Sequence, residues 1–147
     1  MSTRARRKLI QWLVVVALFV VAILPIIPPV ETGAGEATAF STGSALNHVE
    51  AIARQPHPIG SEENARVRQY LGDELDELGL AAETQTIEVM DYFGTPGNTV
   101  PVVNVMARIA GSYSTGALAL VAHYDTVPST PGANDDSGAV ATLLEIG

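Results

Sequence analysis

The sequence predicts an α/β domain, a mixed sheet covered by helices, preceded by one transmembrane helix. Two stretches with apolar residues at helical spacing open the domain, and stretches with the alternating or continuous apolar pattern of strands follow them. A separate run of nineteen uncharged residues, 9–27, precedes both. The chain has 147 residues, which suffices for one domain.

Residues 9–27 form the predicted transmembrane signal-anchor helix. At about 1.5 Å per residue, this stretch covers roughly 28 Å of hydrocarbon. Positive charge before a span keeps that end of a chain in the cytoplasm. Residues 1–8 are therefore predicted to be a basic cytoplasmic tail, with basic residues Arg4, Arg6, Arg7 and Lys8. We expect a single-pass membrane protein whose domain lies outside the cytoplasm.

A cleavable signal peptide is the alternative for this segment. Ala37, Thr38 and Ala39 form a small-residue pattern of the kind found at cleavage sites. Ala39 lies twelve positions beyond Ile27, whereas cleavage usually falls close to the apolar stretch. The distance favours an uncleaved anchor.

Charge and cysteine content exclude two classes of function. The exported part carries four basic residues against all sixteen acidic residues of the chain, so nucleic acid is excluded as a partner. The chain has no cysteine, which excludes disulfide bonds and a cysteine-ligated zinc ion.

A linker rich in Gly, Ala and Thr, residues 28–43, leads to a domain predicted over residues 44–147. Ser44 is placed to cap the first helix, which ends before Pro56 and Pro58. Ser61 is placed to cap a second helix. That helix has an apolar stripe and stops at Gly79; the stripe is Val67, Leu71, Leu75 and Leu78.

Three strands and a final helix follow. The alternating pattern of residues 83–90 predicts a partly exposed strand, and residues 102–109 are expected to pair with it as a hairpin. Residues Ala117–Ala122, ALALVA, form a continuous apolar run that predicts a strand buried on both faces. Residues 138–146 predict the opening turns of a helix.

Residues with metal-binding chemistry follow the predicted buried strand, in AHYDTVPSTPGANDDSG. His123 comes at the carboxyl end of that strand, where ligands bind in α/β sheets. The side chains of His123 and Asp125 leave the same face of an extended chain, so Asp125 can fix the ring of a metal-binding His123. Asp135 returns across a loop stiffened by prolines, and its carboxylate can bridge two cations. Imidazole and carboxylate ligands predict zinc.

Four other residues have simpler interpretations. Asp136 or Ser137 could cap the following helix instead of serving a site. His57 stands between two prolines and is interpreted as part of a rigid turn. His48 is interpreted as lying on a solvated helix face. Neither histidine is predicted to bind metal.

The segment HYDTVPSTPGANDDSGAVATLLE resembles the first metal-ligand segment of the di-zinc aminopeptidases, the family-28 metallopeptidases. The stretch ARQPHPIGSEENARVRQYL is similar to the opening of the domain in the membrane-bound branch, which includes aminopeptidase Y-like and endoplasmic-reticulum metallopeptidase-like proteins. The likeness covers about residues 40–147. It implies a zinc-aminopeptidase-like three-layer sandwich. It also implies that His123 ligates one zinc, Asp135 bridges two, Asp125 orients His123, and the Asp135–Asp136 bond is cis.

The resemblance also implies a peptide substrate and hydrolysis through a water activated by two zinc ions, with removal of N-terminal residues. In the family, a later Glu-Glu pair supplies the general base and a ligand, and an Asp and a His complete the site. The sequence ends at Gly147 without them. We therefore expect an incomplete, truncated peptidase domain that is inactive alone.

Three alternatives remain open. Family-20 metallopeptidases and deacylases carry a segment like HYDTVP, but their bridging Asp comes later than the twelve-residue gap between His123 and Asp135. A non-catalytic binding module with the peptidase fold is a second alternative. A short membrane protein with no enzymatic role is the third.

Overall fold

The computed structural model describes residues 3–23, 40–91, 96–113 and 116–147. The chain divides into two compact units, Met1–Glu31 and Thr32–Gly147. The predicted linker, 28–43, lies outside the described residues except for its last four positions.

The first unit contains helix α1 (Thr3–Ile23), whose large apolar side chains from Leu9 to Val21 are exposed. Within the described ranges, no helix is both long and apolar enough to cross a bilayer. The predicted transmembrane helix over 9–27 is therefore not confirmed. Helix α1 includes the basic residues Arg6, Arg7 and Lys8, which were predicted to precede the span. Residues 24–27 of the predicted span lie outside the described residues.

Helices α2 (Thr42–Ile52) and α3 (Glu62–Glu77) open the second unit and confirm the two predicted helices. Ser61 caps α3 as predicted, because its hydroxyl accepts from the Asn64 N–H at 3.0 Å. The predicted cap of α2 is wrong by three residues. Ser41 is the capping residue, and the N–H of Ser44 donates to its hydroxyl at 3.2 Å.

The core of the second unit lies where three helices meet. Helix α4 (Gly138–Ile146) confirms the predicted final helix and packs along α2, and both contribute to one apolar cluster with α3. The buried members of this cluster are Ile52, Val67, Leu71, Val140 and Leu144. Val67 and Leu71 belong to the apolar stripe predicted for α3. Burial of the whole cluster away from water holds the three helices together.

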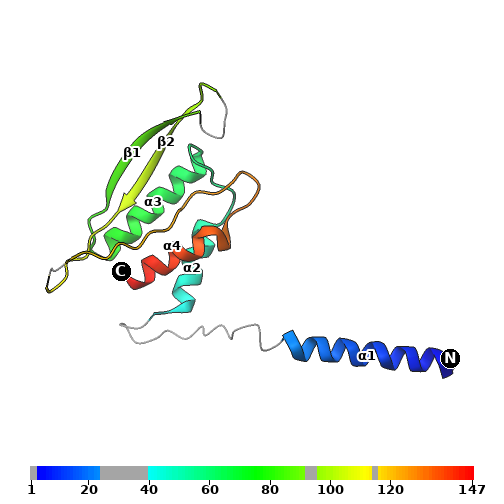
Figure 1. Cartoon of the computed structure of the whole chain (residues 1–147). Helices are drawn as coiled ribbons and strands as arrows, with labels where there is room; N and C mark the ends of the chain where they lie inside the picture. Colours follow the sequence, from blue (N-terminus) through cyan, green and yellow to red (C-terminus); the bar gives the residue numbers. More distant parts are fainter. Residues whose placement is uncertain (1–2, 24–39, 92–95, 114–115) are drawn as a thin grey trace. The chain divides into compact units, whose positions relative to one another are not determined.

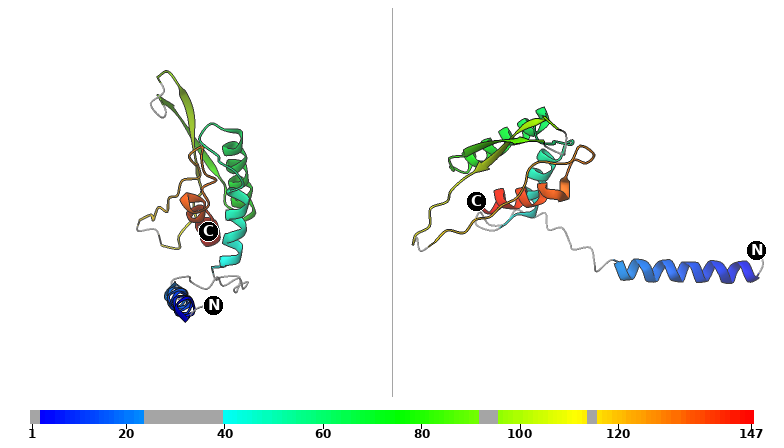
Figure 2. Two further views of the ribbon diagram at one scale, coloured as in Figure 1. Left: turned by 90° about the vertical axis from the view of Figure 1, so that its right-hand side faces the viewer. Right: turned by 45° about the horizontal axis from the view of Figure 1, so that its top comes forward.

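Strands β1 (Glu83–Met90) and β2 (Thr99–Met106) form an antiparallel hairpin in which Thr86 faces Val103. The predicted hairpin is confirmed, but β2 starts three residues earlier than predicted and includes Pro101. Proline is tolerated there because β2 pairs only with β1 in the described sheet, leaving one strand edge without backbone partners. Helix α3 runs along the hairpin in both Figure 1 and Figure 2.

The prediction of a buried strand at Ala117–Ala122 is wrong. This segment forms no strand, and Leu118 and Val121 are 86% and 88% exposed. A strand buried on both faces needs neighbouring strands and covering layers. The described sheet has two antiparallel strands and is not mixed, so the apolar run is not paired into it. The three-layer sandwich implied by the resemblance is seen only as a mixed α/β arrangement of helices and one hairpin.

The chain then extends past the core and turns back into α4 (Figure 1). Ala122 and Tyr124 pack against the apolar cluster, and the Tyr124 hydroxyl donates to the carbonyl oxygen of Val103 at 2.6 Å. A short helical turn, η3 (Ala133–Ser137), leads directly into α4. These contacts hold the two ends of the predicted metal loop, residues 123–135, against the packed part of the domain.

Candidate metal centre

The structure brings together His123 and Asp135, which are twelve residues apart. Nε2 of His123 lies 3.1 Å from Oδ1 of Asp135. His123 lies in the irregular segment that precedes η3, and Asp135 lies in η3 itself. Both side chains are open to solvent, being 51% and 87% exposed.

Asp125 lies on the other side of the His123 ring. Nδ1 of His123 is 3.0 Å from the main-chain oxygen of Asp125 and 3.6 Å from its carboxylate Oδ1. The nearer contact is to the carbonyl, so the backbone of Asp125 makes the hydrogen bond that fixes the ring. The role predicted for its carboxylate stays a prediction.

The contacts of His123 with the Asp125 carbonyl and the Asp135 carboxylate favour a positive charge at or beside the ring. A carbonyl oxygen and a carboxylate only accept hydrogen bonds, whereas a neutral imidazole has one N–H to donate. If Nδ1 donates to Asp125, Nε2 meets the carboxylate of Asp135 with a lone pair. The pair is therefore stable either as an imidazolium or with a cation that both atoms contact.

The pKa of His123 shows the same electrostatics. Partial burial lowers this pKa, but the hydrogen bonds to the Asp125 carbonyl and the Asp135 carboxylate raise it more. The charges of Asp125 and Asp136 add to the increase, so the pKa of His123 lies above its usual value. The site attracts a positive charge.

The donor pair fits zinc by chemistry and by spacing. Zinc binds imidazole nitrogen and carboxylate oxygen, and two ligands of one tetrahedral zinc ion lie roughly 3.3–3.4 Å apart. The observed separation of 3.1 Å is close to that value. In the described part of the chain, no group of three or more His, Cys, Asp or Glu residues is placed to hold a metal ion. His123 and Asp135 thus supply two donors.

The loop between these donors has a tightly fitted backbone. Gly132 has a φ of 69°, in the left-handed region, and its N–H bonds to the hydroxyl of Thr130. A Cβ at Gly132 would clash with Cγ2 of Thr126 and lie 2.7 Å from the main-chain oxygen of Asp135. Only glycine fits this position.

Asp136 and Ser137 differ from their predicted capping role. The carboxylate of Asp136 accepts a long hydrogen bond, 3.4 Å, from the N–H of His123. Ser137 occupies the N-cap position of α4 but makes no capping hydrogen bond, and its buried hydroxyl oxygen has no partner in the described structure. The Asp135–Asp136 peptide bond is cis, as the resemblance implied.

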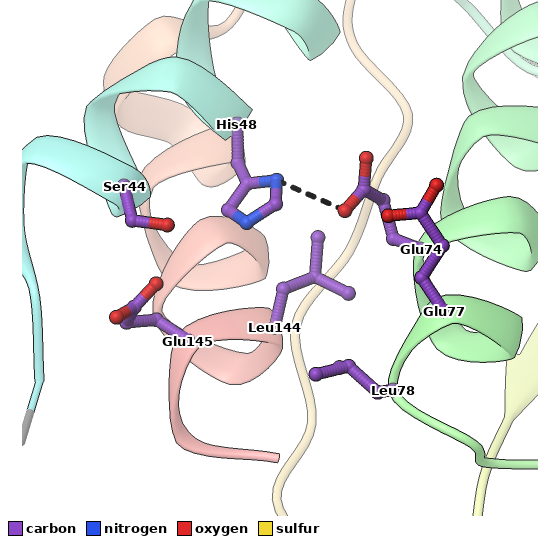
Figure 3. Close-up of a pocket in the computed structure, with 7 residues that line it drawn as sticks. All are labelled: Ser44, His48, Glu74, Glu77, Leu78, Leu144 and Glu145. Atoms are coloured by element: carbon purple, nitrogen blue, oxygen red, sulfur yellow. Dashed lines mark ion pairs between the residues drawn. The ribbon is translucent and has the colours of Figure 1, made fainter. Parts of the chain in front are cut away.

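A second polar site lies between α2, α3 and α4 and does not include these donors. The pocket there has a volume of about 280 Å³. Figure 3 shows His48 pointing toward Glu74 across it. His48 is 14% exposed, with Nδ1 2.6 Å from the Tyr70 hydroxyl and 3.8 Å from the Glu74 carboxylate. The prediction that His48 lies on a solvated face is therefore wrong. Glu145, also in this pocket, accepts from the Ser41 N–H at 2.9 Å.

His57 contacts Thr126 of the metal loop, a pairing that the sequence analysis did not predict. His57 is fully buried in the connection between α2 and α3, and its main chain bonds to Thr126, sixty-nine residues away. No local pattern pairs residues at such a distance. The hydroxyl of Thr126 and its place directly after Asp125 were the available signals.

The helices, the hairpin and the His–Asp pair form a mixed α/β domain, and similarity to known proteins identifies its family. The sequence profile of peptidase family M28 matches residues 104–147. The chain belongs to peptidase family M28. This finding confirms the resemblance drawn from the motif.

The matching relatives include fungal vacuolar membrane proteases. The protein from Eremothecium gossypii is 35% identical over 115 residues, covering 67% of this chain and 11% of the relative. The protein from Coprinopsis cinerea is 30% identical over 165 aligned residues, covering 99% of this chain and 16% of the relative. The chain thus spans about a tenth to a sixth of the length of these relatives.

A solved structure supports the fold. Glutaminyl cyclase from Porphyromonas gingivalis matches with a TM-score of 0.63 and 32% sequence identity. The match covers 73% of this chain and 38% of that protein. Most of this chain therefore shares its fold with part of that protein.

Proposed function

We propose that this chain supplies two zinc ligands, His123 and Asp135, to a membrane-anchored exopeptidase that removes N-terminal residues from peptides. The observation that carries the proposal is the 3.1 Å approach of the His123 Nε2 and the Asp135 carboxylate. Membership of peptidase family M28 supports the reaction class. The name shared by these relatives, vacuolar membrane protease, supports a location at a membrane.

The roles of the chain's own residues follow from their contacts. The carbonyl of Asp125 holds Nδ1 of His123, which leaves the Nε2 lone pair for the metal. The exposed Asp135 carboxylate has two oxygens, so it can contact two metal ions. When bound, zinc supplies Lewis-acid activation of water and of the scissile carbonyl. Asp125, with its carboxylate 3.6 Å from Nδ1, adds negative charge beside the ring.

The solved structure favours a second candidate reaction, the cyclisation of N-terminal glutamine. This candidate rests on the 32% identity to glutaminyl cyclase. Both reactions act on the amino end of a peptide. One substrate separates them: glutaminyl-aminomethylcoumarin releases the fluorophore under an aminopeptidase and becomes the pyroglutamyl derivative, with loss of ammonia, under a cyclase.

The test uses this chain and, in parallel, the longest open reading frame that contains it. Each protein is purified without metal, loaded with zinc and assayed with aminoacyl and glutaminyl fluorogenic substrates. Fluorophore release that depends on zinc and is lost in His123→Ala supports the peptidase. A longer protein that binds zinc but transforms neither substrate supports a non-catalytic binding module and overturns the proposal.

A further inference from the structure

The connection between α2 and α3 is fastened to the metal loop by a reciprocal pair of hydrogen bonds. The N–H of His57 donates to the Thr126 hydroxyl at 2.7 Å, and the N–H of Thr126 donates to the His57 carbonyl at 3.3 Å. The Asn64 side chain donates to the same carbonyl at 3.2 Å. His57, Asn64 and Thr126 are all buried, so water does not compete for these bonds.

The imidazole of His57 hydrogen-bonds within its own turn. Its Nδ1 lies 2.9 Å from the main-chain oxygen of Gln55, which can only accept, so Nδ1 carries the proton. Its Nε2 is buried and has no hydrogen-bond partner in the described structure. The ring therefore stiffens the turn, and the main chain of His57 makes the connection to Thr126.

One peptide group links this connection to His123. The carbonyl of Asp125 and the N–H of Thr126 belong to the same planar unit. The N–H end is bonded to His57, and the carbonyl end accepts from Nδ1 of His123 at 3.0 Å. Because the unit is rigid, fixing one end fixes the direction of the other.

We propose that His57 and Thr126 are positioning residues that orient the His123 imidazole through the Asp125–Thr126 peptide group. The proposal rests on the zinc site proposed above, but the orientation it describes exists in the metal-free chain. Neither residue is one of the two proposed ligands. Their contribution is to hold Nδ1 as the protonated nitrogen of His123, so that Nε2 is available as a ligand.

The test compares Thr126→Val, which lacks the hydroxyl acceptor, with Thr126→Ser, which keeps it. Val67→Ala is the control, because it loosens the buried cluster without removing a hydrogen bond to the metal loop. Two quantities are measured on the full chain: the tautomer of His123 from imidazole ¹⁵N shifts without metal, at a pH high enough for the ring to be neutral, and zinc affinity by competition with a fluorescent chelator. The chain has three histidines, which keeps the assignment simple.

We expect Thr126→Val to mix the His123 tautomers and to weaken zinc binding about 10-fold. Thr126→Ser is expected to restore both, and Val67→Ala to leave both unchanged. The positioning role is overturned if folded Thr126→Val keeps the single tautomer and the wild-type affinity, or if Val67→Ala shows the same losses.

Two further readouts keep the outcomes distinct. The zinc proposal fails if the wild-type chain does not bind zinc, or if His123→Ala does not remove the binding. In either case the tautomer measurement still tests the positioning role. If Thr126→Val does not fold, amide hydrogen exchange in the wild-type chain decides. A slowly exchanging Thr126 amide supports the buried pair, and an amide that exchanges as fast as exposed loops contradicts it.

Discussion

Nε2 of His123 and Oδ1 of Asp135 lie 3.1 Å apart, although the ring of His123 already bonds the Asp125 carbonyl through its other nitrogen. A neutral imidazole cannot donate to both oxygens. The arrangement therefore needs a proton or a metal ion, and this requirement is the physical basis of the proposed zinc site.

Gly132→Ala should destabilise the domain by roughly 1–3 kcal/mol, because the added Cβ meets Thr126 and the main chain of Asp135. It should also weaken zinc binding, since both donors adjoin this loop. Urea unfolding and zinc titration measure the two effects.

The matched control is Gly72→Ala in the interior of α3, where a Cβ meets nothing within 4 Å. This control should stabilise the domain by roughly 0.5–1 kcal/mol. Equal effects of the two substitutions would contradict the account.

Arg66→Met should destabilise the packing of α2 on α3 by about 1 kcal/mol. The guanidinium of Arg66 donates to the Ala51 carbonyl at 2.9 Å and the Ile52 carbonyl at 3.3 Å, so it satisfies the last turn of α2 from a neighbouring helix. Arg68→Met is the control, since Arg68 makes no hydrogen bond or ion pair within the described residues; its effect should stay within about 0.5 kcal/mol. Urea unfolding that ranks Arg68→Met as the more damaging change would refute this role.

Tyr70 should make stability fall at alkaline pH. Burial and the carboxylates of Glu74 and Glu77 raise the pKa of Tyr70 to about 12. The folded state then keeps a proton that the unfolded chain loses near pH 10, so this contribution is complete below about pH 10 and is lost between about pH 10 and 12. Tyr70→Phe should flatten the free energy of unfolding across that window.

The alkaline effect is measured by urea unfolding between pH 9 and pH 12, with absorbance at alkaline pH to follow phenolate formation. These conditions span the window that the raised pKa defines. Tyr113→Phe is the control, because Tyr113 is 92% exposed. A Tyr70→Phe curve that falls as steeply as the wild-type curve would show that Tyr70 does not titrate in this way.

The sequence predicted those parts of the fold that depend on local pattern. The apolar stripe of α3 includes Val67 and Leu71, both buried, and the alternation in β1 marked one strand of the hairpin. The strand predicted at Ala117–Ala122 failed because its burial depends on neighbouring strands and not on its own composition. The prediction that His48 is solvated failed for a related reason, because the sequence around His48 does not show that Tyr70 and Glu74 lie opposite it.

The candidate site was predictable only in part. The motif identified His123, Asp125 and Asp135, which the structure brings close together. It did not identify the carbonyl of Asp125 as the group that holds the ring, because a side-chain pattern carries no information on backbone direction. Nor did it pair Thr126 with His57, whose contact depends on how distant segments pack.

Zinc affinity of the metal-free chain tests the proposed ligand pair. We predict that the wild-type chain binds zinc and that His123→Ala and Asp135→Asn each weaken binding roughly 10-fold or more, while His48→Ala leaves it unchanged. Circular dichroism of each variant verifies that it is folded. Zinc binding that survives both site substitutions, or that His48→Ala removes, would contradict the assignment of His123 and Asp135 as ligands.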